Sequence, residues 1–148
     1  MAMSCSLHAA ELESLKQFIN RKPLFLSDKN DTELVASRCS ALYLVLSSRT
    51  EKVSNSKEVQ SIAKEFGEQA FVFDQVREVI SKVTDHKIQS SVSQQKQFAI
   101  NYADITLTSW KQYNDIFRGM VNDDLDVCRN NYPQFKKIAN NLSKEFKK

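Results

Sequence analysis

Apolar residues along this chain recur mostly at intervals of three and four, the spacing that places side chains on one face of a helix. The first such segment covers 7–22 and ends before Pro23, and the second covers about 31–48. Because the second segment is apolar on nearly every side, we expect other helices to surround it. Asn30 and Asn55 each precede a glutamate by three residues, which predicts that they cap the second and third helices.

The third predicted helix has the most regular pattern, a seam in which spacings of three and four residues alternate over nearly four heptads. Gln69 is its only polar member, and the seam consists of Val59, Ile62, Phe66, Gln69, Phe73, Val76, Ile80 and Val83. Such a seam is typical of the core of a left-handed bundle. Gly67 lies beside it and suggests a close approach of two backbones. The same seam could instead pair two copies of the chain.

A fourth helix is predicted from about Val92 to Val121, after a polar stretch with a boundary near Asp85. Two apolar stripes run along this helix, which is more apolar surface than one neighbouring helix can bury. A turn is expected at 122–124, and Pro133 fits the first position of a last helix. One of the stripes contains the residues that we predict to contact a partner, which are Leu107, Trp110, Phe117 and Val121.

The composition agrees with a helical fold. The 148 residues include only 2 glycines and 2 prolines, too few for the turns of a β-sandwich, and 41% are hydrophobic. The apolar runs are shorter than the roughly 18–20 residues that span a bilayer. We therefore predict one all-α domain over 1–148, an up-and-down bundle of four main helices with a shorter extra helix.

One short segment, Lys16–Lys22, resembles the start of the first bundle helix in the PsbQ-type extrinsic photosystem subunits of plants. That family consists of four-helix bundles, so the resemblance implies the same fold class. We transfer no site residue from it.

The three cysteines, Cys5, Cys39 and Cys128, are odd in number, widely spaced and without a C-x-x-C pair. This pattern argues against a disulfide framework and against a zinc site, and it indicates a reducing compartment. Cys39 is expected to act as a small buried hydrophobic residue. With an N-terminus that shows no pattern of an export signal, the expected location is cytoplasmic.

Motifs for catalysis, metals and cofactors are missing from the sequence. The glycines form no phosphate-binding loop, and His8 and His86 belong to no metal-ligand pattern, so we predict no catalytic, metal or cofactor residue. The acidic residues at 123, 124 and 126 are interpreted as helix caps. An alternative remains a small enzyme or a ligand carrier with an inter-helix pocket, using scattered residues: His86, Tyr102, Asp104 and Cys128.

The formal net charge is only +3, so charge alone selects no partner. The last helix combines Phe135 and Phe146 with a lysine-bearing face, which leaves nucleic acid or an anionic membrane as an alternative partner. A solvated polar face is the simpler interpretation, and we do not expect nucleic acid binding. The lysines of this region are Lys136, Lys137, Lys144, Lys147 and Lys148.

The function that we predict is protein–protein interaction, as an adaptor, an inhibitor or an accessory subunit of a larger assembly. The apolar surface around Trp110 is its positive support, and the lack of catalytic motifs points the same way. Self-association through the heptad seam also remains open.

Overall fold

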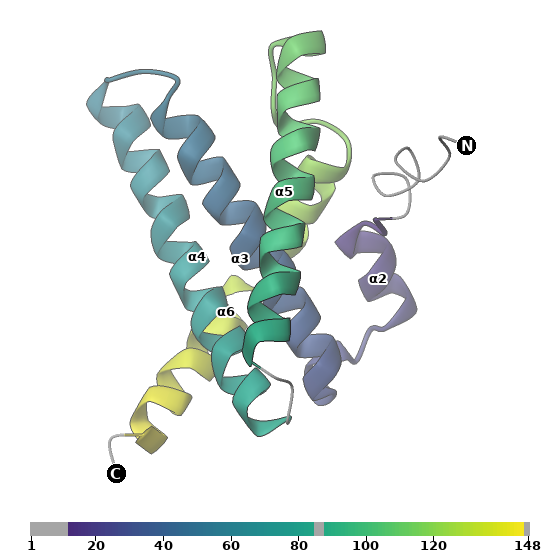
Figure 1. Ribbon diagram of the computed structural model, residues 1–148. Coiled ribbons are helices and arrows are strands. Elements are labelled where there is room, and N and C mark those ends of the chain that lie inside the picture. The colour runs from purple at the N-terminus through teal and green to yellow at the C-terminus, as the bar shows by residue number, and fades with distance from the viewer. Residues whose placement is uncertain (1–11, 85–87, 147–148) are drawn as a thin grey trace.

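In the described part of the computed structural model, four long helices and one short helix alternate in direction and form an all-α up-and-down bundle (Figure 1). The structure describes residues 12–84 and 88–146. The elements are α2 (Leu15–Arg21), the 3-10 turn η1 (Phe25–Ser27), α3 (Lys29–Glu51), α4 (Lys57–Val83), α5 (Ile88–Tyr113) and α6 (Met120–Phe146). The predicted fold class, four main helices with a shorter one, is confirmed.

The short helix α2 begins later than the sequence pattern predicted. Ser14 caps it, accepting a hydrogen bond from the Gln17 backbone N–H while the Gln17 side chain accepts from the Ser14 backbone N–H. This capping box fixes the start at Leu15, so residues 12–14 precede the helix. Positions 7–11 of the predicted helix lie outside the described residues.

Helix α3 is the centre of the bundle, with contacts to α4, α5, α6 and η1. Residues on all its sides are buried, which confirms that other elements surround it. The prediction that Asn30 caps this helix is wrong. Asp28 caps the helix instead, because its Oδ1 atom accepts the Asp31 backbone N–H at 3.0 Å.

Helix α4 packs along α3 through the middle of the predicted seam, where Phe66, Phe73 and Val76 are buried. The two ends of the seam differ, since Ile62 and Val83 are exposed. The predicted cap, Asn55, is also wrong by one residue, because Ser56 accepts the Val59 backbone N–H.

The backbones of α3 and α4 approach each other near Gly67, as the sequence suggested. A Cβ atom at Gly67 would lie 3.5 Å from the Ser47 Oγ atom, which is an ordinary van der Waals distance. The Ser47 hydroxyl donates to the Ala63 carbonyl at 2.7 Å. A small residue therefore leaves this serine room to tie the two helices together.

The predicted fourth helix is in fact interrupted. Helix α5 ends at Tyr113, and the loop 114–119 separates it from α6. Asn114 adopts a left-handed conformation with φ 56°, and its N–H donates to the Trp110 carbonyl at 2.8 Å. Gly119, with φ 54°, closes the loop. Asparagine and glycine are the residues that tolerate this conformation best, so the chain can leave the helix here.

Helix α6 continues through two predicted breaks, the turn at 122–124 and the start at Pro133. Pro133 lies inside the helix, although proline removes a backbone donor there. Leu125 and Phe135 are buried on either side of it, and this packing keeps the helix in one piece. The sequence prediction failed because a local proline rule was outweighed by tertiary packing.

An aromatic cluster fills the core where α3, α4 and α6 meet. The rings of Tyr43 and Phe73 stack with centroids 5.7 Å apart, and Phe73 contacts Phe135 at 4.9 Å. The Tyr43 hydroxyl is buried without a hydrogen-bond partner among the described residues. Burial raises the pKa of Tyr43 to about 12.

Candidate functional site

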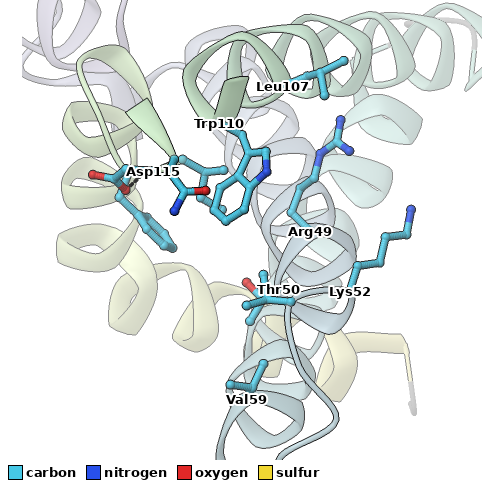
Figure 2. Close-up of a pocket in the computed structure, with 11 residues that line it drawn as sticks. Arg49, Thr50, Lys52, Val59, Leu107, Trp110 and Asp115 are labelled. Atoms are coloured by element: carbon cyan, nitrogen blue, oxygen red, sulfur yellow. Dashed lines mark hydrogen bonds between the residues drawn. The ribbon is translucent and has the colours of Figure 1, made fainter. Parts of the chain in front are cut away.

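A cavity of about 480 Å³ opens where the α3–α4 turn, the end of α5 and the α5–α6 loop come together (Figure 2). We call it the groove. Most of its lining is apolar. The residues that line it are Arg49, Thr50, Lys52, Val53, Val59, Leu107, Trp110, Asn114, Asp115, Ile116 and Phe117.

The loop 114–119 forms one wall of the groove. Asn114 turns the chain away from the axis of α5, and the Asp115 Oδ1 atom accepts the Phe117 N–H at 2.9 Å. Ile116 is buried between these residues and anchors the loop to the core. Its burial leaves the neighbouring Phe117 side chain at the wall of the groove.

The opposite wall comes from the α3–α4 turn. The Gln60 side chain donates to the carbonyls of Glu51 and Ser54, at 3.0 and 2.8 Å. These hydrogen bonds stabilise the turn, and they give a donor to carbonyls that have no partner within α3. Arg49 connects the two walls, because its Nη2 atom donates to the Ala103 carbonyl of α5 at 3.2 Å.

Three of the four predicted contact residues line the groove. Leu107, Trp110 and Phe117 are 39%, 43% and 40% exposed. The fourth, Val121, is fully buried in α6 and does not line it. The prediction that these residues share one helical face is wrong, since Phe117 lies in the loop and Val121 in the next helix.

Sequence reasoning missed the other half of the lining, which comes from positions 49–59. No signal in the sequence connects this turn with Trp110, because the two segments meet only through the antiparallel arrangement of α3, α4 and α5. The three residues that were predicted stood out because they are large, apolar and surplus to a single packing face.

Charged side chains in the lining are unevenly placed. Arg49 and Lys52 come from the α3 side, whereas Asp115 lies on the far side, next to the loop (Figure 2). The groove therefore combines an apolar centre with a positive end.

Three of the four residues named in the enzyme alternative lie in the described part of the chain. Tyr102 and Cys128 are fully buried, Asp104 is exposed on α5, and His86 lies outside the described residues. Within 12–84 and 88–146, no cluster of three or more His, Cys, Asp and Glu side chains is placed to hold a metal ion.

A buried polar network occupies the interior where α2, α3, α5 and α6 meet. Arg38 donates to the Asp124 carboxylate at 2.7 Å and to the Tyr102 hydroxyl at 2.8 Å. The Tyr102 hydroxyl in turn donates to the Asp124 Oδ2 atom at 2.6 Å, and the Leu15 backbone N–H donates to the Asp124 Oδ1 atom at 2.7 Å. The interpretation of Asp124 as a cap is therefore wrong, because its carboxylate joins four helices.

The titration of this network follows from its burial. Burial raises the pKa of Tyr102 above its usual value, so the phenol keeps its proton and donates to Asp124. Burial also raises the pKa of the Asp124 carboxyl, and the Arg38 guanidinium opposes that shift. Both side chains are closed off from solvent, so the network links the helices from within the core.

A disulfide bond joins Cys39 of α3 to Cys128 of α6, with Cα atoms 5.6 Å apart. The expectation of free thiols is wrong for these two residues, and Cys5 lies outside the described residues. No local sequence motif marks this bond, since 89 residues separate the two cysteines. Their proximity arises only because α6 packs against α3, one residue from the Arg38 network.

Helix α6 carries the aromatic and lysine residues on which the nucleic acid or membrane alternative depends. Phe135 is fully buried against Phe73 and cannot stack on a base, while Lys136 and Lys137 are exposed. The side chains at 143–146, and all of 147 and 148, lie outside the description. In the part of the chain that is described, no helix combines the length and apolar character needed to cross a membrane.

Comparison with known proteins finds no matching family model, no matching curated protein and no matching solved structure. The short resemblance of Lys16–Lys22 to PsbQ-type subunits therefore gives no family assignment.

Proposed function

We propose that this chain is a protein-interaction module whose groove binds an apolar segment of a partner polypeptide. One observation carries the proposal: Leu107, Trp110 and Phe117 line the same cavity, and each is about two-fifths exposed. Tryptophan and other large aromatic side chains dominate binding energy when they sit in a pocket that a partner closes. Adaptor, inhibitor and accessory subunit are the roles compatible with this surface.

The groove differs from the scattered apolar residues found on any protein surface. Phe71 on α4 is 62% exposed, more than Trp110, but it does not line the groove. A partner side chain placed in the groove would contact both walls at once, which buries more apolar area than contact with an isolated side chain.

Photo-crosslinking tests the proposal. Replacing Phe117 by a photoreactive phenylalanine analogue should give a discrete crosslinked polypeptide in an extract of the cells that produce the protein. The same analogue at Phe71 is the matched control. Adding Trp110→Ala should abolish the product at 117. Equal products at both positions, or a product at 117 that survives Trp110→Ala, would contradict the proposal.

A ligand carrier is a second candidate, and the cavity volume favours it. About 480 Å³ falls within the roughly 300–1,000 Å³ typical of small-molecule sites. Native mass spectrometry of the purified chain would show a bound compound of constant mass, absent from Trp110→Ala. Finding only the unliganded mass would remove the support for this candidate.

The disulfide also bears on location. Disulfides persist mainly in oxidising compartments. We therefore infer that the chain works in such a compartment, in place of the cytoplasmic location that the spacing of the cysteines favoured.

A further inference from the structure

We infer that the groove selects an acidic amphipathic segment, in which an apolar anchor residue is accompanied by an aspartate or glutamate. This inference rests on the proposed function and specifies the chemistry of the partner. It depends on where the charges of the groove lie and on which of them already have partners.

The anchor follows from the centre of the groove. Leu107, Trp110 and Phe117 line it from α5 and the loop 114–119. Val53 lines it from the turn between α3 and α4, and Val59 from the first turn of α4. Because most of the surface here is hydrocarbon, a polar side chain placed among these residues would lose more hydrogen bonds to water than it could regain. The segment must therefore present a leucine-like or aromatic side chain here.

The acidic residue follows from Arg49 and Lys52. Neither forms an ion pair with any described residue, whereas Arg21, Arg38 and Arg77 each do. Arg49 uses Nη2 on the Ala103 carbonyl, and the rest of its guanidinium remains available for a carboxylate. Lys52 is exposed, one turn along the same wall.

The negative groups near the groove reduce this charge without cancelling it at the α3 wall. Glu51 lies between Arg49 and Lys52 in the chain, and the carboxyl end of α3 adds about half a negative charge, but Glu51 forms no ion pair with either cation. Asp115 lies on the opposite side, where its Oδ1 atom accepts the Phe117 N–H (Figure 2). A carboxylate beside Arg49 therefore avoids Asp115, and the bound segment acquires a preferred orientation.

A displayed library of random peptides, selected on the full chain and counter-selected on Trp110→Ala, tests the inference. Groove-dependent peptides should be enriched in a large apolar residue with a neighbouring Asp or Glu. Trp110 is the only tryptophan of the chain, so its fluorescence reports the binding of peptides that lack tryptophan.

Charge reversal sharpens the test. Lys52→Glu should weaken the selected peptides about tenfold or more, and Arg49→Glu at least as much. Lys64→Glu, an exposed charge on α4 outside the groove, is the matched control and should leave the affinity within about twofold. Because Arg49 also contacts Ala103, Lys52→Glu is the variant that decides if Arg49→Glu fails to fold.

The outcomes separate the two claims. Groove-dependent peptides without acidic residues, or affinities that ignore Lys52→Glu, would overturn the inference and leave the proposed function standing. A selection that yields no peptide sensitive to Trp110→Ala would overturn the proposed function itself. The groove could instead be occupied by a second copy of the chain, and analytical ultracentrifugation of the chain alone measures whether it dimerises. A dimer that is present in the native chain and absent in Trp110→Ala would also overturn the inference.

Discussion

Arg38 and Arg49 lie on the same helix, α3, yet they belong to two different regions of the molecule. Arg38 is buried and bonds to Tyr102, Asp124 and the Glu13 carbonyl. Arg49 is half-buried beside the groove and makes one hydrogen bond, to the Ala103 carbonyl. The charged and phenolic groups that contact Arg38 are paired within the chain, whereas part of the Arg49 guanidinium beside the groove has no partner among the described residues. The comparison separates a region that maintains the fold from the region that we propose to bind a partner.

The largest effect should come from Arg38→Ala. Removing the guanidinium leaves Asp124 buried without its counter-charge, so we expect the free energy of unfolding to fall by about 3–5 kcal/mol. Arg49→Ala is the matched comparison and should cost less than about 1 kcal/mol. Urea denaturation of both variants measures the difference. Equal losses of stability in the two variants would show that the two arginines contribute equally to the fold.

Next in size is the loss of the Cys39–Cys128 disulfide. The paired change Cys39→Ser with Cys128→Ser should lower the free energy of unfolding by about 2–4 kcal/mol, since the bond closes a long loop of the unfolded chain. Thermal denaturation with and without reductant measures the effect. Cys5→Ser is the control, and sensitivity to reductant should persist in it. A linked peptide containing Cys39 and Cys128 should appear in a non-reducing digest.

Tyr43 predicts a smaller, pH-dependent effect. Its pKa rises from 10.0 to about 12 on folding because burial disfavours the phenolate. The unfolded chain therefore loses this proton first, and stability should fall by on the order of 2 kcal/mol as the pH rises from 10 to 12. Tyr43→Phe should flatten that slope and cost little at neutral pH, because the hydroxyl has no described partner. An identical slope in both proteins would refute this assignment.

Trp110→Ala should lower the free energy of unfolding by about 1–2 kcal/mol, less than the loss of the Arg38 guanidinium or of the disulfide, because the indole is only partly buried. Its main consequence should be lost binding. Phe71→Ala controls for the removal of an exposed aromatic side chain. A loss of several kcal/mol from Trp110→Ala would mean that the groove residues belong to the core.

Much of the fold could be predicted from the sequence, because periodicity depends on burial. The seam through Phe66 and Phe73 and the surrounded helix α3 are cases in which local pattern and tertiary packing agree. The breaks were harder. Asn114 ends a helix although apolar spacing continues beyond it, and Pro133 fails to end one because packing supports it.

The candidate site could be predicted only in part, because sequence patterns are local and the groove joins segments that are far apart in the chain. Trp110 and Phe117 were found because their size and apolar character exceed what one helix face can bury. Arg49 and Lys52 come from a segment far away in the sequence, and only the fold brings them to the groove. The partners of Cys39 and Arg38 were equally hidden, since each contact crosses from α3 to α6.

The covalent link between α3 and α6 has a consequence for proteolysis. A protease that cuts within 114–119 would produce two fragments, one containing Cys39 and the other Cys128. The fragments would remain a single molecule until the disulfide is reduced. Nicking could therefore open one wall of the groove while the rest of the bundle stays assembled.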